Sequence, residues 1–352
     1  MAIFGNTGVG IDLGSSVTSI YLSDEEKVVL REPTCVLVSA ENGQDVLAVG
    51  SQAHSLSGRT AEDTDLVKPI ERGCVADVEL TALLMVAQCE KAMGKKKPLE
   101  KATLLCSLPG GASRVARSAL FQAMTATGAK KIASLRTPVA AALGAGLDIS
   151  APRGVLEICL GGGLTELAVL SMNGIAAIRS LPFGGETMDE DIVRWFWREK
   201  GVLIGMRTAE QLKRELGTVL PEDEDEMAGD DPVLVKGKEA STGRPASVET
   251  CSQDVKKALE ESVVRVIDAM KNALYNIPPE LSSDLLETGI QLSGGGAFLT
   301  GLKERLEREV GVPVHVSAHP HRDVILGLGA AVSDERLMTL LERGGALDLT
   351  GD

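Results

Sequence analysis

The chain has 352 residues, 44% of them hydrophobic, with a formal net charge of −14 at pH 7 and a sequence pI near 4.9. This length exceeds the usual size of one domain and allows a large buried core, so we expect two lobes. The strong negative charge argues against nucleic-acid binding, because a phosphate backbone requires a basic protein face.

The cysteines and the apolar runs indicate a soluble cytoplasmic protein. The six cysteines form no C-x-x-C pair and stand mostly in apolar runs, as buried reduced thiols do. No apolar run approaches the roughly 20 residues that a membrane span needs, and the first residues lack a signal-peptide pattern.

The first predicted element is a strand that ends in a glycine-rich turn. Residues 10–16 read GIDLGSS, and residues 17–22 continue as a second strand. Asp12 points into the turn, where glycine permits positive φ and close approach of the backbone to a ligand, so that N–H groups can face a phosphate chain. The turn consists of Gly14, Ser15 and Ser16.

Strands and helices then alternate. A helix is predicted over 78–93, where apolar residues recur on one face. This alternation predicts α/β layers with a partly parallel sheet. The following elements are a strand at 102–108, a helix at 112–127, a strand at 131–135 and a helix at 138–146.

The second half restarts the pattern about 147 residues later. A strand at 155–160 runs into three glycines and a returning strand at 165–172, which repeats the first unit and suggests two related lobes with a cleft between them. Cys159 occupies the position in the second unit that Asp12 occupies in the first, so we expect a nucleotide-binding site with diminished catalytic function. The three glycines are Gly161, Gly162 and Gly163.

The remaining elements close the second lobe. The acidic run at 221–226 is expected to be a solvated loop. The other expected elements are a strand at 176–181, helices at 186–199, 208–216 and 253–275, a strand at 289–292, a third glycine turn (Gly294, Gly295 and Gly296) and a helix at 297–310.

These pieces in this order resemble the MreB family, the bacterial actin-like proteins that shape rod cells. The similarity runs from about residue 9 to 332. More distant actin-like relatives share the glycine turns but not the intervening segments. The matching segments are 10–18, 31–34, 68–70 with 73–77, 144–147, 161–163, 184–186, 207–210, 278–281 and 292–296.

The resemblance implies the actin-like fold shared with chaperone ATPases and sugar kinases. Each of two lobes would hold a mixed sheet flanked by helices, with the nucleotide in the cleft between them. The first lobe would cover residues 1–147, with a small inserted subdomain at about 34–75. The second would cover residues 148–352, with an inserted subdomain at about 183–255.

The resemblance also implies ATP and Mg²⁺ as ligands. Gly14, Ser15 and Ser16 would contact the β- and γ-phosphates from one side, and the glycines at 161–163 would do so from the other. Asp12 would help to hold hydrated Mg²⁺. Glu210 and Lys213, three residues apart on one helix face, would reach the ribose and adenine. The glycines at 294–296 would pass beside the base and the α-phosphate.

Three residues that differ from the family pattern stand at positions expected to take part in ATP hydrolysis. Cys159 replaces an aspartate, and a thiol is a poor ligand for Mg²⁺. Leu164 replaces a threonine near the γ-phosphate, and Thr137 replaces a glutamate that orients the attacking water. Thr165 is kept as the second threonine. Backbone N–H donors survive side-chain changes, so the sequence predicts nucleotide binding with weak or absent hydrolysis and leaves open whether the chain is an enzyme.

The resulting hypothesis is a bacterial cytoskeletal protein that forms filaments, helps to determine cell shape and positions cell-wall synthesis. A silent actin-like scaffold that regulates a true filament-forming MreB is the main alternative, and an ATPase for organelle alignment or plasmid segregation is a third. The partners implied are further copies of the chain, other MreB-type proteins and membrane-bound wall-synthesis proteins. Weak contact with the inner face of the cell membrane, through Ile3, Phe4 and the lysines at 95–97, and a plain solvated loop at 95–97 both stay open.

Overall fold

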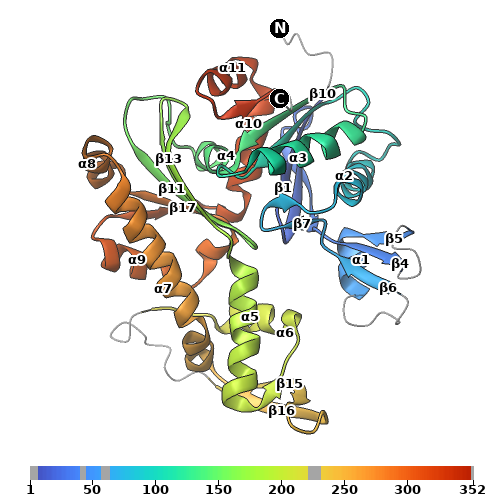
Figure 1. Ribbon diagram of the computed structural model, residues 1–352, viewed down its shortest axis with the longest axis vertical. Helices are drawn as coiled ribbons and strands as arrows, with labels where there is room; N and C mark the ends of the chain where they lie inside the picture. Colours follow the sequence, from blue (N-terminus) through green and yellow to red (C-terminus); the bar gives the residue numbers. More distant parts are fainter. Residues whose placement is uncertain (1–6, 40–44, 57–63, 221–230, 350–352) are drawn as a thin grey trace.

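Two large mixed sheets organise the chain (Figure 1). The computed structural model describes residues 7–39, 45–56, 64–220 and 231–349. The acidic run at 221–226 and the pair Ile3 and Phe4 lie outside the described residues. Among the described helices, none combines the length and apolar character needed to cross a membrane.

The first sheet has six strands, in the order β19 (Leu347–Asp348), β10 (Lys131–Arg136), β9 (Thr103–Leu108), β1 (Gly8–Leu13), β2 (Val17–Leu22) and β3 (Lys27–Pro33). β1 pairs antiparallel with β2 and parallel with β9, and β10 pairs parallel with β9. The last strand of the described residues, β19, pairs with β10, so residues 347–348 return to the sheet that begins with β1. The boundary between residues 147 and 148 stays a prediction.

The second sheet has five strands, in the order β13 (Gly174–Leu181), β12 (Thr165–Ser171), β11 (Val155–Leu160), β17 (Ile290–Ser293) and β18 (Val314–Val316). β11 and β12 are antiparallel, as β1 and β2 are, and β11 is parallel to β17. Both sheets therefore begin with the same strand–turn–strand unit, which the sequence repeat predicts.

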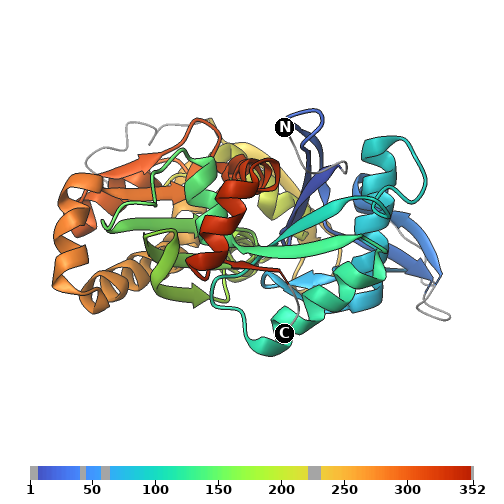
Figure 2. The same cartoon turned by 90° about the horizontal axis from the view of Figure 1, so that it is seen from above.

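Two helices lie between the sheets and belong to the core of both (Figures 1 and 2). They are α4 (Thr137–Gly144) and α10 (Asp323–Ser333). Leu105 of the first sheet and Cys159 of the second share one apolar cluster with them. The helices cross closely, since a Cβ built on Gly327 would lie 1.8 Å from the carbonyl oxygen of Ala140.

The outer faces of the sheets are covered by longer helices. Val9, Ile11 and Leu104 of the first sheet pack against α2 and α3, while Leu156 and Ile158 of the second pack against α5 and α7. These helices are α2 (Val78–Met93), α3 (Arg114–Ala126), α5 (Gly185–Trp195) and α7 (Ser252–Asn276). Of the shorter helices, α6 (Met206–Leu216) contacts α5 and α7, α8 (Pro279–Thr288) contacts β11, α9 (Leu302–Val310) contacts β18, and α11 (Glu335–Arg343) contacts α10 and β19.

Three small sheets extend this frame. One lies within the predicted insertion at 34–75, another lies within that at 183–255, and a two-stranded hairpin precedes α2. The first small sheet consists of β4 (Val36–Ser39), β5 (Val46–Val49) and β6 (Thr64–Val67), with α1 (Gly50–Leu56) directly after β5. The second small sheet consists of β14 (Val202–Leu203), β15 (Val233–Glu239) and β16 (Pro245–Thr250). The hairpin consists of β7 (Ile70–Glu71) and β8 (Cys74–Val75).

The prediction of one helix over 297–310 is wrong. A short 3₁₀ turn covers Gly295–Phe298, and α9 begins only at Leu302. Gly301 adopts φ +80°, which an α-helix cannot accommodate, so the chain turns there before the helix starts.

Candidate functional site

The two repeated turns share one backbone hydrogen bond. In the first turn (residues 14–16), the N–H of Gly14 donates to the carbonyl oxygen of Val17 at 3.2 Å. In the second turn (residues 161–163), the N–H of Gly161 donates to the carbonyl oxygen of Leu164 at 2.9 Å. Each donor and acceptor of the second turn stands 147 residues after its counterpart (161 − 14 and 164 − 17), so the repeat extends to hydrogen bonding.

The structure brings these turns into direct contact. A Cβ built on Gly162 would lie 2.1 Å from the Oγ of Ser16, and one built on Gly163 would lie 2.6 Å from the Oγ of Ser15. The expectation of positive φ holds only for the third turn (residues 294–296), where Gly294 has φ +87°. Close approach therefore explains the glycines of the first two turns.

Several N–H groups at this contact are free to bind a ligand. Within the described part of the chain, the N–H groups of Ser15, Ser16, Gly162 and Gly163 donate no hydrogen bond. Clustered backbone N–H groups form an anion-binding surface because their partial positive charges add. The contact between the turns can therefore bind phosphate oxygens once the turns separate.

The start of α5 holds the second turn in place. The N–H groups of Gly185 and Glu186 donate to the carbonyl oxygens of Gly161 and Gly162, at 3.0 and 2.8 Å. Lys213 of α6 reinforces this arrangement, since its Nζ lies 2.6 Å from the carbonyl oxygen of Gly185.

Lys213 also forms an ion pair with a residue of α5. Its Nζ lies 2.7 Å from the Oδ1 of Asp189, whose pKa burial raises to about 6 although the Lys213 charge opposes the change. Glu210, one turn earlier on α6, pairs with Arg214 at 2.6 Å. Contact of Glu210 and Lys213 with a ribose or adenine stays a prediction.

The third turn packs against the end of β11. A Cβ built on Gly294 would lie 2.3 Å from the carbonyl oxygen of Leu160, and one on Gly296 would lie 1.9 Å from a methyl carbon of the same leucine. Since Leu160 immediately precedes the second turn, residues 294–296 lie next to it. Gly295 has open space above its Cα.

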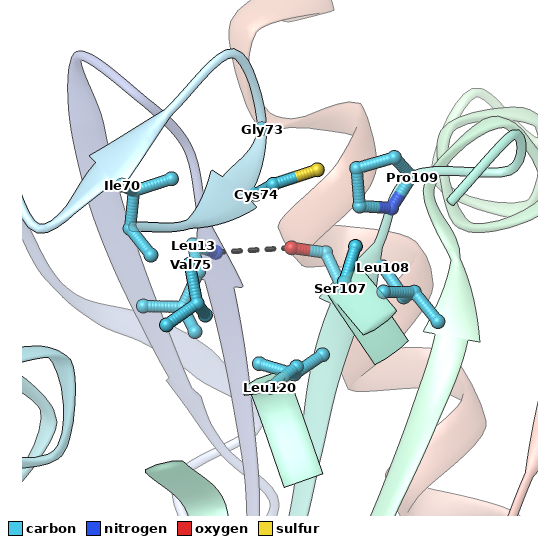
Figure 3. A pocket seen from close by; sticks show the side chains of 10 residues that line it. Leu13, Ile70, Gly73, Cys74, Val75, Ser107, Leu108, Pro109 and Leu120 are labelled. Carbon is cyan, nitrogen blue, oxygen red and sulfur yellow. Dashed lines mark hydrogen bonds between the residues drawn. The ribbon is translucent and has the colours of Figure 1, made fainter. Parts of the chain in front are cut away.

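Asp12 lies at the end of β1 and is held by Ser107 of β9. The Oγ of Ser107 donates to the Oδ1 of Asp12 at 2.9 Å. The same oxygen accepts from the N–H of Leu13 at 3.0 Å (Figure 3). Burial raises the pKa of Asp12 to about 6, which the Ser107 hydrogen bond and the charge of Arg31 counteract. The cavity beside Ser107 in Figure 3, about 10 Å³, can hold one water molecule at most and is no nucleotide site.

Asp12 is the residue expected to help to hold hydrated Mg²⁺. The Cys159 thiol is buried in an apolar cluster, and burial together with the charge of Glu157 raises its pKa, so it stays neutral. No group of three or more acids, histidines or cysteines suited to a metal occurs in the described ranges. Mg²⁺ usually keeps several waters and is bound through one or two carboxylates together with substrate phosphates, so the expected role of Asp12 needs no such group and stays a prediction.

Glu186 is a functional candidate that the sequence did not suggest. Its Oε1 accepts from the Oγ of Ser16 at 2.5 Å and from the Nζ of Lys68 at 2.9 Å. A carboxylate from the second half of the chain therefore binds the hydroxyl predicted to bind phosphate. The separation of 170 residues between Ser16 and Glu186 explains why no local pattern reveals this contact.

The positions expected to differ from the family, and the kept Thr165, lie in the following surroundings. Leu164 contacts the β7–β8 hairpin, since a Cβ built on Gly73 would lie 3.0 Å from its Cδ2. Thr165, the kept threonine, donates from Oγ1 to the carbonyl oxygen of Phe183 at 2.9 Å. Thr137 begins α4 next to Pro138. None of these contacts resembles an arrangement that would activate water.

Comparison with known proteins places the chain in a family. The MreB/Mbl protein family matches residues 6–339. The cell shape-determining protein Mbl of Bacillus subtilis (strain 168) is 34% identical over 326 residues, which cover 93% of this chain and 96% of that protein. The cell shape-determining protein MreB of Escherichia coli (strain K12) is 34% identical over 327 residues, 92% of each chain.

Solved structures show the same fold. The crystal structure of MreB 5 of Spiroplasma citri bound to AMPPNP has a TM-score of 0.88 and 26% identity, over 97% of this chain and 99% of that one. A MamK double helical filament matches with a TM-score of 0.77 at 17% identity, over 94% of this chain and 99% of that one. The chain therefore has the actin-like fold and belongs to the MreB/Mbl family.

Proposed function

We propose that this chain binds ATP or ADP between its first and second turns, hydrolyses ATP slowly or not at all, and forms cytoplasmic filaments that help to determine cell shape and position cell-wall synthesis. The observation that supports nucleotide binding is the cluster of free N–H groups at the contact between the two turns. The Spiroplasma citri relative has been solved with AMPPNP and with ADP, which is in keeping with this proposal.

Weak hydrolysis follows from the side chains at the turns. Cys159 is neutral and buried, Leu164 is packed on Gly73, and Thr137 has no carboxylate to orient a water molecule. Loss of one positioned acid or base commonly costs a factor of about 10²–10⁴ in rate. Because residues of one constellation act together, these factors cannot be multiplied.

The turns must separate before a γ-phosphate enters between them. Ser16 is in contact with Gly162 and hydrogen-bonded to Glu186 in this structure. An incoming phosphate therefore competes with the Glu186 carboxylate for the same hydroxyl. ADP, which lacks the γ-phosphate, needs less separation and is expected to bind at least as well as ATP.

Self-association is the proposed basis of the filament, and the MamK double helical filament shows that this fold can form one. Other MreB-type proteins and membrane-bound wall-synthesis proteins are proposed partners. Of the three lysines proposed for weak membrane contact, Lys97 pairs with Glu100 at 2.9 Å on the exposed loop after α2. Such an exposed pair is weak, so Lys97 stays able to contact anionic lipid.

The tight contact across the turns favours one alternative, a silent scaffold that regulates a true filament-forming MreB. Electron microscopy and pelleting of the purified chain, with ATP, with ADP and without nucleotide, distinguish the two. Filaments that form with nucleotide support the proposal. Monomers under every nucleotide and salt condition would leave the scaffold as the better account.

A further inference from the structure

A cavity of about 240 Å³ lies between the second sheet and the last turns of α7. Its floor follows the strand register, because Val169 of β12 is opposite both Leu156 of β11 and Ala177 of β13. Directly opposed residues of antiparallel strands project from the same face of a sheet. These three side chains therefore share the face of the sheet that packs against α7.

Short side chains leave this space unfilled. Ala177 lines the cavity from the sheet and Ala273 lines it from the helix. The helix ends at Asn276, before two consecutive prolines that cannot continue it, and β13 is an edge strand of its sheet. The cavity opens to solvent where its lining residues Arg179, Asn272 and Asn276 are exposed.

One cation and two amide groups stand at this opening. Arg179 of β13 is opposite Leu167 of β12, so it projects from the same face as the apolar floor. Among the described residues, the Arg179 guanidinium has no ion pair and no hydrogen bond. Asn272 and Asn276 donate from Nδ2 to the carbonyl oxygens of Asp268 and Asn272, at 2.8 and 2.6 Å, which leaves both Oδ1 atoms available as acceptors.

The size and the charge of the cavity fit a small acid with an apolar body. An apolar cavity of roughly 150 Å³ is enough to bind benzene, so about 240 Å³ accommodates a ring together with a short side group. Displacement of poorly held water from apolar surroundings favours such a ligand. A carboxylate on the ligand would match the fork of N–H donors on the unpaired guanidinium of Arg179.

We infer that this cavity binds a small organic acid, with its apolar body on Leu156, Val169 and Ala177 and its carboxylate on Arg179. The site goes beyond the proposed function and is separate from the nucleotide. Leu156 stands five residues before Gly161 of the second turn (161 − 156), which is about 16 Å of extended strand. The described residues that line the cavity include no nucleophile and no acid or base. The ligand is therefore an effector and not a substrate.

Titration of the full chain with 3-phenylpropionate and with its neutral amide, followed by ligand-observed NMR, tests this inference. We expect the wild type to bind the acid with a Kd of about 1 mM or lower, and the amide about tenfold more weakly because a charged hydrogen bond is lost. Arg179→Gln should weaken binding of the acid about tenfold and leave that of the amide unchanged. Arg336→Gln, at an exposed position on α11, is the matched control and should bind both probes as the wild type does.

A second variant fills the cavity. Ala273→Leu places three more carbon atoms in the space that the probe needs, so we expect neither probe to bind to it. Its melting temperature shows whether it folds. Because Arg179 is exposed, Arg179→Gln remains informative if Ala273→Leu does not fold.

Several outcomes would overturn the inference. One is the absence of wild-type binding for both probes up to about 10 mM. Another is equal affinity of the wild type and Arg179→Gln for the acid, and a third is probe binding to a folded Ala273→Leu variant. If neither probe binds and Ala273→Leu no longer pellets with nucleotide as the wild type does, the cavity belongs to a contact between copies of the chain instead.

Discussion

Ser16 and Glu186 join the two halves of the chain through a 2.5 Å hydrogen bond from hydroxyl to carboxylate. Lys68 contacts the same carboxylate oxygen, so Glu186 is bound as a phosphate oxygen would be, by a hydroxyl and a cation. These contacts join the first turn to the start of α5, whose N–H groups bind the carbonyl oxygens of the second turn. We therefore expect the affinity for nucleotide to depend on the free energy needed to separate the Glu186 carboxylate from Ser16 and Lys68.

Glu186→Gln should tighten ATP binding by about tenfold. The amide carries no negative charge, so it competes less well with phosphate for Ser16 and Lys68, and loss of one charged hydrogen bond is commonly about 1.5–3 kcal/mol. Titration with ATP measures this change. Glu190→Gln, on the same helix and exposed, is the control and should leave the affinity unchanged. Weaker binding in Glu186→Gln alone would show that Glu186 assists the nucleotide.

Restoring the family's residues should raise phosphate release. The triple variant Cys159→Asp/Leu164→Thr/Thr137→Glu returns an acid, a hydroxyl and a water-orienting carboxylate, so we expect at least about a tenfold increase in rate. A phosphate-release assay at saturating ATP provides the measurement. Vigorous release from the unaltered chain would mean that these positions do not limit hydrolysis.

Gly162→Ala should weaken ADP binding by about tenfold or more. The added Cβ would lie 2.1 Å from the Ser16 Oγ, which displaces one turn from the other and crowds the free N–H groups. Gly205→Ala is the control, since Gly205 has open space and φ −82°. Equal ADP affinities of the two variants would remove the second turn from the site.

Glu157→Gln should stabilise the chain more at pH 8 than at pH 5. Glu157 is completely buried, and burial raises its pKa well above the usual 4.5; the charge of Asp323 adds to this rise, and a hydrogen bond with Ser293 counteracts it. The folded state therefore binds a proton more tightly than the unfolded state. Its stability falls as the pH rises from about 4.5 toward the raised pKa.

The glutamine variant lacks this penalty, so its gain in melting temperature over the wild type should grow with pH. Thermal unfolding followed by circular dichroism at both pH values measures it. Glu280→Gln, at an exposed position on α8, should show no such dependence. A gain in Glu157→Gln that is equal at both pH values would mean that this carboxyl does not titrate on unfolding.

Local patterns predicted the regular elements well. The helix Val78–Met93 has the predicted limits, because Asp77 caps its first turn and Gly94 ends it in the left-handed conformation. The strand Val155–Leu160 also matches. The β15–β16 hairpin was not predicted, since its strands are mostly exposed and carry few large apolar residues beyond the start of β15.

The candidate site was predicted only where backbone conformation defines it. The glycines at 14, 161–163 and 294–296 are recognisable because turns and close contacts restrict side-chain size. Ser107 and Glu186 could not be found, since they meet Asp12 and Ser16 across 95 and 170 residues.

The central claim is tested most directly by identifying the nucleotide that stays bound to the purified protein. The purified chain is incubated with ATP, freed of unbound nucleotide, denatured, and its released nucleotide identified by ion-exchange chromatography. We predict close to one nucleotide per chain, still mostly ATP after an incubation that converts a hydrolysing MreB entirely to ADP. Recovery of ADP alone would contradict weak hydrolysis, and recovery of no nucleotide would contradict binding between the two turns.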